Sequence, residues 1–349
     1  MKLGDRLAIR ATGRWLPEKF ESTSDAVAAG LITEQDSAKL GTVSLAVAGA
    51  DSPPPMMAVR AARSALDEAG WAGERIDLAL HAWIHHQGHD FWSPAHYVAA
   101  VVGAKQALPL GVQQMCNGGP AALHLAVRWL LAEPGATALV TTADRFANPG
   151  FDRWGGDYGV MYGDSGTAVL LHHRDGEDDE LNLLAVTSSA APELERLHRG
   201  DDEFSPAARW HSTSVDVRRT KKAFFATAGI EILTETTLDH VKRLLLTSLA
   251  DAGIDADDDR IARIVLPRLG RAALDTAYRP ALDGLTKAEV VDVGTHTGHL
   301  GAGDTAASLH ELTRSAPLRP GEIAAVISGG GGFTWSCVLV ERPSEKGKS

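Results

Sequence analysis

Two parts of the chain repeat the same sequence signals in the same order, and this repeat limits the folds that the chain can adopt. The shared order is a helix that ends at a glycine, a polar turn and a strand. A second helix, a turn with Pro and Gly and a further strand follow. In the first part these elements are expected at 64–71, 76–80, 121–128 and 138–142, and in the second part at 247–254, 261–266, 307–314 and 323–327. Several matches in one order indicate an internal duplication.

The duplication predicts an α/β protein made of two similar halves. We expect these halves at residues 1–175 and 207–349, with a polar connecting segment at 176–206 between them. Two such halves pack about a pseudo-dyad, which brings their equivalent central helices together. The starts of the helices at 121–128 and 307–314 are therefore expected to meet at one site.

Composition and charge narrow the classes of function. The chain has 349 residues, of which 44% are hydrophobic, and its net charge is −11. The negative charge argues against nucleic acid as the main partner, and no apolar run reaches the length of a membrane span. The first residues lack the apolar core of a signal peptide, and two cysteines do not make a disulfide framework, so we expect a cytoplasmic protein. The basic stretch 218–222 is interpreted as a solvated helix start, or else as a contact for a phosphate or an acidic carrier protein.

Cys116 is the first candidate for catalysis. It follows an apolar stretch and precedes the helix expected at 121–128, so the thiol is expected at a strand-to-helix turn. The positive end of a helix dipole favours thiolate, and a thiolate is a strong nucleophile toward thioesters. The alternative is a buried core cysteine, but the small residues that follow Cys116 leave room for a substrate to reach the sulfur.

His296, His299 and Asp304 precede the second of the two central helices. If the helix starts meet, the chain offers a thiol, an imidazole and a carboxylate at one site. A cysteine nucleophile needs a base to hold it as thiolate, and that base needs an orienting carboxylate. The alternatives are that Asp304 serves only as a helix N-cap and that either histidine is an ordinary loop residue.

Two other histidines have a spacing that metal ligands can have. His85 and His89 have the i, i+4 spacing of a zinc site, but Gly88 lies between them and no acidic third ligand follows. We interpret the segment around these histidines as a loop that lines a substrate entrance or a dimer contact, and we expect no metal.

At several motifs the chain resembles the ketosynthase III enzymes of the thiolase superfamily. The motifs are Gly103-Ala104-Lys105, Tyr162 to Ala168, Gly303 to Ser308 and Gly329 to Trp335. The resemblance implies a five-layered αβαβα fold, a homodimer and an acyl-Cys116 intermediate. It further implies an oxyanion hole from the backbone N–H of Cys116 and one from Gly331 or Gly332. No cofactor is implied, since acyl-CoA or acyl-carrier protein serves as co-substrate. The glycine run is no dinucleotide loop, because residues 333–340 continue as a strand, in which Cys337 is expected to be core.

Two positions depart from the family pattern. Arg268 stands where the family has a histidine, and Asp304 replaces the asparagine of its Gly-Asn-Thr motif. The family's His/Asn pair donates hydrogen bonds to the enolate that forms when malonyl thioester loses carbon dioxide. An ionised aspartate cannot donate, and it repels that negative charge. We therefore expect plain acyl transfer with Cys116, Asp304 and a histidine base, His299 in preference to His296.

The departures resemble those of ketosynthase-like acyltransferases in aromatic polyketide antibiotic pathways, as does the segment 90–97. This resemblance implies transfer of an acyl group, malonyl first, to a hydroxyl of a small sugar or polyketide acceptor. Arg268 or Arg153 is expected to hold the free malonyl carboxylate, and Phe333 to contact substrate. The alternatives are a starter-unit ketosynthase III and a non-catalytic partner that keeps only the fold.

Overall fold

The computed structural model describes residues 2–175 and 178–344, and ten strands of these residues form one mixed sheet. In spatial order the strands are β10 (Glu289–Val291), β9 (Ile261–Val265), β11 (Ile323–Gly330), β12 (Thr334–Glu341), β8 (Leu181–Ala190), β1 (Lys2–Trp15), β7 (Ser165–His173), β6 (Thr137–Asp144), β4 (Leu78–Ala82) and β5 (Leu108–Val112). A separate antiparallel pair is formed by β2 (Phe20–Ser22) and β3 (Ser44–Ala46).

The strand order shows the duplication directly. One half of the sheet runs β5-β4-β6-β7-β1 and the other β10-β9-β11-β12-β8, so each strand has a counterpart at the same place in the other half. The antiparallel pair β1–β8 joins the two halves. The predicted α/β fold from two duplicated halves is confirmed.

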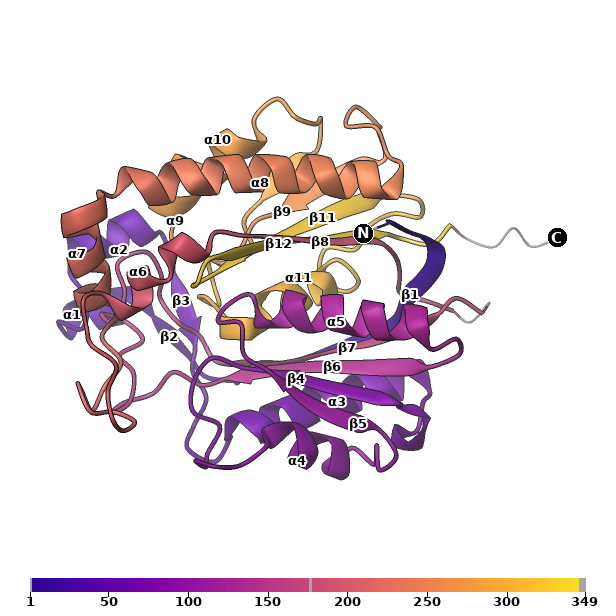
Figure 1. Cartoon of the computed structure of the whole chain (residues 1–349), viewed down its shortest axis with the longest axis horizontal. Coiled ribbons are helices and arrows are strands. Elements are labelled where there is room, and N and C mark those ends of the chain that lie inside the picture. Colours follow the sequence, from indigo (N-terminus) through magenta and orange to yellow (C-terminus); the bar gives the residue numbers. More distant parts are fainter. Residues whose placement is uncertain (1, 176–177, 345–349) are drawn as a thin grey trace.

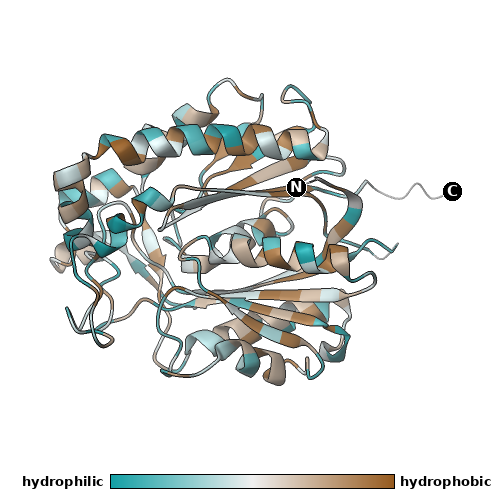
Figure 2. Cartoon of the chain, in the orientation of Figure 1, coloured by the Kyte–Doolittle hydropathy of each residue, from teal (hydrophilic) through white to brown (hydrophobic). Residues whose placement is uncertain are grey.

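Helices separate and cover the two halves of the sheet, which gives five layers (Figure 1). The helices α8 (Glu231–Ala252) and α10 (Arg279–Leu282) cover one outer face, and α3 (Pro54–Ala69) and α4 (Pro94–Val101) cover the other. Between the halves lie α5 (Gly118–Ala132) and α11 (Asp304–Glu311). The strands of both halves are largely hydrophobic, and α8 is polar along its outer side (Figure 2). Burial of these apolar strands against three helical layers is what stabilises the arrangement.

The remaining helices lie mostly around one end of the sheet. They are α1 (Thr23–Ala28), α2 (Glu34–Leu40), α6 (Arg196–Arg199), α7 (Val217–Ala228) and α9 (Arg271–Ala273), with the short turns η1 (Gly73–Arg75), η2 (Pro192–Leu194), η3 (Leu274–Tyr278) and η4 (Gly301–Gly303). Within the described ranges, no helix combines the length and the apolar character needed to cross a bilayer.

The segment 176–206 differs from the expected connection. Residues 176 and 177 lie outside the described residues, but Leu181–Ala190 form β8, a central strand that pairs with both β1 and β12. Leu181 and Leu183 are buried, whereas the second part of the strand contains three consecutive polar residues, Thr187 to Ser189, and is partly exposed. Because its second part is polar, the sequence pattern predicted a connecting segment here and not a strand. By its place in the sheet β8 is the counterpart of β1, so the second half of the fold begins at Leu181 rather than at 207.

The ends of the repeated helices follow the sequence closely. Helices α3 and α8 both end at a glycine in the left-handed conformation, Gly70 with φ of 66° and Gly253 with φ of 72°. A glycine adopts this conformation without the steric cost that a Cβ would bring. The two central helices begin earlier than expected, at Gly118 and at Asp304. Cys116 is therefore only two residues ahead of α5.

The small residues after Cys116 allow the starts of α5 and η4 to pack closely. A Cβ at Gly119 would lie 2.4 Å from the carbonyl oxygen of Ala302, and a Cβ at Gly118 would lie 3.2 Å from the Ala302 methyl. We expected these glycines to leave room for substrate beside the sulfur. Instead they bring the turn before α11 against α5, and this contact sets the distance between the two halves of the site.

Replacing Gly119 with alanine should therefore destabilise the fold. The new methyl group meets backbone at 2.4 Å, which forces the two elements apart, and overpacking of this kind costs about 1–3 kcal/mol. Gly159→Ala is the matched control, because a Cβ there meets no atom within 4 Å. Thermal unfolding checks the prediction, which is contradicted if both variants unfold at the wild-type temperature.

Candidate active site

Cys116 lies in a tight turn between β5 and α5, as the sequence predicted. The N–H of Asn117 donates to the carbonyl of Gln114 at 3.1 Å, and Met115 has a φ of 50°. A left-handed backbone at a methionine is sterically costly, and such residues gather at functional sites. The side-chain amide of Asn117 donates to the Ser336 hydroxyl at 2.9 Å, which ties the turn to β12. The half-buried thiol is thereby held at the start of α5.

His299 and Asp304 form a short, buried contact ahead of α11. The distance between His299 Nδ1 and Asp304 Oδ2 is 2.6 Å, and both side chains are buried. The other oxygen of Asp304 accepts from the N–H of Leu300 at 2.8 Å. The His299 ring packs edge-on against Tyr162, with 5.4 Å between ring centroids. With Nδ1 bound to a carboxylate, Nε2 of the imidazole is the nitrogen left to exchange protons.

Charge favours the protonated form of His299. Burial by itself lowers the pKa of this imidazole, but the charges of Asp304 and Cys116 outweigh it and raise the pKa well above its ordinary value. Nε2 is buried and has no hydrogen-bond partner among the described residues, although Cys116 lies close enough to act on the ring. The arrangement therefore favours an imidazolium beside the Cys116 sulfur.

His299, and not His296, is the histidine in contact with Asp304. The side chain of His296 is exposed, and its carbonyl accepts from the Ser44 hydroxyl at 2.9 Å. Asp304 is also more than a helix cap, because the N-cap position of α11 belongs to Gly303. The structure thus brings Cys116, His299 and Asp304 together and leaves His296 outside.

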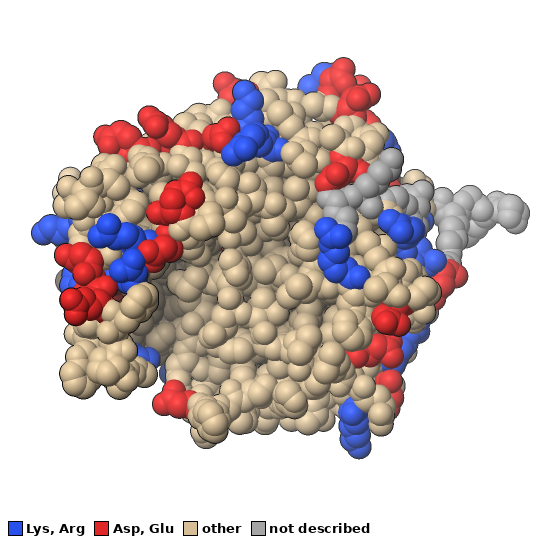
Figure 3. All heavy atoms as spheres, viewed as in Figure 1, with Lys and Arg blue, Asp and Glu red and all other residues tan. Residues whose placement is uncertain are grey.

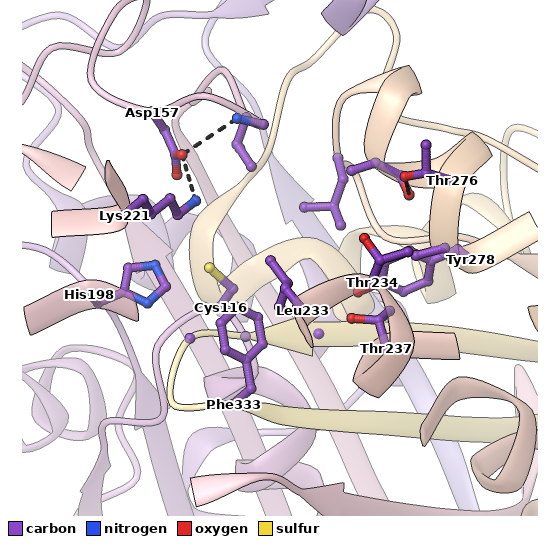
Figure 4. Close-up of a pocket in the computed structure, with 18 of the residues that line it drawn as sticks. Cys116, Asp157, His198, Lys221, Leu233, Thr234, Thr237, Thr276, Tyr278 and Phe333 are labelled. Atoms are coloured by element: carbon purple, nitrogen blue, oxygen red, sulfur yellow. Dashed lines mark hydrogen bonds and ion pairs between the residues drawn. The ribbon is translucent and has the colours of Figure 1, made fainter. Parts of the chain in front are cut away.

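Cys116 lines a cavity of about 160 Å³ between the two halves (Figure 4). In the close-up, Asp157, His198 and Lys221 lie on one side of the sulfur, and Leu233, Thr234 and Tyr278 on the other. The cavity is further lined by Gly159, Val160, Tyr162, Thr237, Leu269, Ala273, Thr276, Ala277, Gly329, Gly330, Gly331 and Phe333. The wall is largely apolar, with polar groups at a few places, as is typical of a small-molecule site.

The glycine-rich segment closes the cavity beside Cys116. Gly331 and Phe333 line it, as the prediction of oxyanion and substrate contacts requires, whereas Gly332 is not part of the wall. A Cβ at Gly330 would lie 2.4 Å from the backbone nitrogen of Asn117, so this segment presses against the cysteine turn. The oxyanion hole itself stays a prediction.

Comparison with known proteins agrees with this site. Residues 110–191 match the family model of 3-oxoacyl-[acyl-carrier-protein] synthase III, and residues 249–342 match the model of its C-terminal part. The solved structure of ChlB3, an acyltransferase, is 33% identical and has a TM-score of 0.85, and the match covers 97% of this chain and 98% of that one. The β-ketoacyl-[acyl-carrier-protein] synthase III of Erythrobacter litoralis is 27% identical over 96% of this chain and 99% of its own.

The chain belongs to the ketosynthase III family. The fold agrees with more distant members too. The priming β-ketosynthase of the R1128 polyketide pathway is only 18% identical, but its structure superposes with a TM-score of 0.77 over 99% of both chains. The chain is thus an enzyme of the ketosynthase III type.

Arg268, one of the two departures, does not face the cavity. Its fully buried guanidinium lies along α11, where it donates to the Asp304 carbonyl at 2.9 Å and the Ser308 hydroxyl at 2.8 Å. It also pairs with Glu311 at 2.9 Å. Its backbone N–H donates to Asp304 Oδ2 at 3.2 Å. This placement does not support the predicted contact with a malonyl carboxylate, and it makes Arg268 a positioning residue for Asp304.

Arg153 is also held away from substrate. Its guanidinium binds both oxygens of buried Asp164, at 3.1 Å and 3.0 Å. Asp164 in turn accepts from the N–H groups of Ala48 and Phe146, both at 2.8 Å. The pair joins three segments of the N-terminal half. This structural role accounts for the presence of Asp164 in the motif Tyr162 to Ala168. Arg153 does not line the cavity, so the second predicted carboxylate contact is unsupported as well.

The basic stretch at 218–222 is mostly neutralised by acidic partners. Arg218 lies 3.4 Å from Asp36, Arg219 lies 2.6 Å from Asp202, and Lys221 lies 2.5 Å from Asp157. The stretch is therefore neither a simple solvated helix start nor a free cationic patch. Lys221 instead reaches the cavity, which the sequence interpretation missed.

A second carboxylate, Asp144, was also missed. It ends β6, is fully buried, and accepts from the N–H groups of Ile84 and His85 at 2.8 and 2.9 Å and of Ala302 at 3.0 Å. Burial raises the pKa of Asp144 to about 7 against the opposing effect of these donors. A polar residue at the carboxyl end of a buried strand was the signal available in the sequence. Asp144 anchors the turn that leads into Asp304.

The two histidines with the spacing of a zinc site, His85 and His89, do not point toward a common site. His85 packs against the rings of Phe146 and Phe151, while His89 lies against Trp92. Across residues 2–175 and 178–344, no three His, Cys, Asp or Glu side chains are grouped so as to hold a metal ion.

Cys116 should become acylated by a CoA thioester, and His299 should be needed for the reaction. Intact-mass analysis after incubation with a panel of acyl-CoAs should show an added acyl mass that Cys116→Ala lacks. His299→Ala should load slowly because it removes the base, while the matched variant His296→Ala should load at the wild-type rate. Equal labelling of Cys116→Ala would contradict the assignment of the nucleophile, and the reverse behaviour of the histidine variants would move the base to His296.

Asp304→Asn should lower the acylation rate by about 10²–10⁴-fold, because the imidazole loses its charged partner.

The Asp304→Asn change should also have a pH-dependent effect on stability. The pKa of His299 is raised in the folded protein, so the stabilising charge interaction is complete below about pH 6.5 and is lost as the pH rises through the raised value. The stability difference between wild type and Asp304→Asn should therefore shrink from pH 6 to pH 10. Thermal unfolding across this range checks it, and a constant difference would contradict the charge interaction.

Proposed function

We propose that this enzyme is an acyltransferase that moves a short acyl group, malonyl first, from CoA or an acyl-carrier protein to a hydroxyl of a sugar or polyketide acceptor. The group passes through a thioester on Cys116 and keeps its carboxylate. No resident cofactor takes part, since the acyl thioester is a co-substrate. The observation that carries the proposal is the 2.6 Å contact of His299 with an aspartate, Asp304, where the family pattern has an asparagine.

The proposed reaction has two balanced steps. The Cys116 thiolate attacks the thioester carbonyl, the bond to the CoA sulfur breaks, and the His299 imidazolium gives its proton to the departing thiolate. The acceptor hydroxyl then attacks acyl-Cys116 while Nε2 of His299 takes its proton, and the cysteine leaves as thiolate. Asp304 keeps the imidazole in one orientation and stabilises its charged form.

Carbon–carbon bond formation by decarboxylation fits this site poorly. An enolate beside Cys116 would need neutral hydrogen-bond donors. Asp304 is an acceptor whose oxygens already bind His299, Leu300 and Arg268, and the Arg268 guanidinium is turned along α11. An alcohol acceptor needs no enolate, so the same residues suit ester formation.

The similarity to ChlB3 supports the proposal, because that protein is named an acyltransferase and is 33% identical along almost the whole chain. The sequence pattern is also similar to that of the ester-forming malonyltransferase of cervimycin biosynthesis, which suggests a sugar hydroxyl as acceptor. Retention of Cys116, His299 and Asp304 in one contact argues against a non-catalytic partner.

A homodimer is part of the proposal. Strand β5 is at one end of the sheet order and carries half-exposed Leu108 and Leu110, and Leu125 of α5 is exposed as well. The middle of the face in Figure 3 is free of charged side chains, which lie around its rim. An uncharged face beside an edge strand is suited to pairing with a second copy, because the edge leaves backbone groups open.

Transfer of an intact malonyl group is the direct test. The enzyme is incubated with malonyl-CoA that carries isotope in all three acyl carbons and with a glycosylated aromatic polyketide, and the product is analysed by mass spectrometry. We expect an ester that retains all three labelled carbons, and none with Cys116→Ala. A product joined by a new carbon–carbon bond, with labelled carbon dioxide released, would contradict the proposal and indicate a starter-unit ketosynthase.

A further inference from the structure

The cavity beside Cys116 contains one buried ion pair. Lys221, from α7, lies with its Nζ 2.5 Å from Asp157 Oδ1, and it is the one Lys or Arg among the described residues that line the cavity. The Asp157 side chain is 1% exposed and that of Lys221 is 12% exposed. Burying a charge pair is costly, so a pair placed in the wall of a substrate cavity calls for a functional explanation.

Asp157 is saturated with hydrogen-bond donors, whereas Lys221 is not. Asp157 accepts from the N–H of Tyr158 at 2.6 Å and from the Tyr162 hydroxyl at 2.9 Å, besides Lys221. Burial raises the pKa of Asp157, but the positive charge of Lys221 outweighs this effect and keeps the pKa below its ordinary value. Among the described residues, Asp157 is the hydrogen-bond partner of the Lys221 ammonium, which has three donors. Asp157 therefore fixes the ammonium in place and leaves donors for a ligand.

His198 is an independent sign of a ligand on this side of the cavity. Its side chain is half-buried and lines the cavity beside Gly331, and its Nδ1 is shielded from solvent without a hydrogen-bond partner among the described residues. Burial, aided by Lys221, lowers the pKa of His198 to about 4, so the ring is neutral and can donate one hydrogen bond. In Figure 4 His198 and Lys221 lie on the same side of the Cys116 sulfur.

The size of the cavity limits the acyl group. Its volume of about 160 Å³ is close to that of an engineered cavity of about 150 Å³ that takes up benzene, a molecule of six heavy atoms. A malonyl group attached to sulfur also has six heavy atoms, three carbons and three oxygens. Its free carboxylate requires a cation or several hydrogen-bond donors once it is out of water.

From these observations we infer that Lys221, positioned by Asp157, binds the free carboxylate of a short dicarboxylic acyl group on Cys116, with His198 as a further donor. The site would then select malonyl-type thioesters over acetyl or propionyl thioesters. The inference rests on the proposed acyl-Cys116 intermediate, and it gives to Lys221 the contact that Arg268 and Arg153 are not placed to make.

Competition for Cys116 tests the inference without any acceptor. The enzyme is incubated with equal amounts of malonyl-CoA and acetyl-CoA, and the acyl group on Cys116 is read by intact-mass analysis at early times. Wild type should load mainly malonyl. Lys221→Met keeps a chain of similar length without the charge, and its malonyl-to-acetyl ratio should fall by about tenfold or more, the loss expected for a charged hydrogen bond.

Two further variants serve as controls for Lys221→Met. Lys222→Met removes the exposed neighbouring charge on α7 and should keep the wild-type ratio. Asp157→Asn/Lys221→Met removes both buried charges, which avoids an unpaired carboxylate if Lys221→Met folds poorly. This double variant should load acetyl and show no malonyl preference.

The outcomes separate the inference from the proposed function. A wild-type malonyl preference that persists in Lys221→Met or in the double variant overturns the inference, and so does a wild type that loads acetyl as readily as malonyl. In both cases an acylated Cys116 still supports an acyltransferase. If no acyl group reaches Cys116 in wild type, the proposed function fails and the inference fails with it.

Discussion

The close approach of two helix starts is the constraint on which the site depends. Gly119 at the beginning of α5 lies against Ala302 in the turn before α11, with no space for a Cβ. Because α5 and α11 belong to equivalent positions of the duplicated halves, this contact brings a thiol from one half next to an imidazole and a carboxylate from the other. The helices share one apolar core, to which Ala122, Ala302 and Leu309 contribute, so the distance between them is set by packing and not by the polar groups.

Two buried carboxylates, Asp144 and Asp304, have different roles in this arrangement. Asp144 takes backbone N–H groups from both sides of the contact, those of Ile84 and His85 on one segment and that of Ala302 on the other. Asp304 takes the N–H of Leu300 with one oxygen and His299 with the other. Asp144 thus fixes the backbone of the turn before α11, and Asp304 orients the His299 imidazole through its hydrogen bond. A neutral asparagine at 304 would offer His299 the same geometry without the charge.

The sequence predicted the elements that have local signals, and it failed where the outcome depends on distant neighbours. Glycines at 70 and 253 marked the helix ends, and the turn at Cys116 followed from the change of pattern around it. Strand β8 was missed because its polar second part looks like a loop until it pairs with β12. The directions of Arg268, Arg153 and Lys221 are decided by Glu311, Asp164 and Asp157, which lie far from them in the sequence or across a turn, so no spacing rule reveals which cation reaches the cavity.

The two departures from the family pattern are coupled in space. Replacing a histidine by arginine at 268 adds a positive charge, and replacing an asparagine by aspartate at 304 adds a negative one. The Arg268 backbone N–H donates to the Asp304 carboxylate, and its guanidinium donates to the Asp304 backbone carbonyl. The Nη2 of the same guanidinium donates to the Glu311 carboxylate. The two replaced residues therefore lie in contact, and the site has a charged base beside Cys116 where the family pattern has two neutral donors.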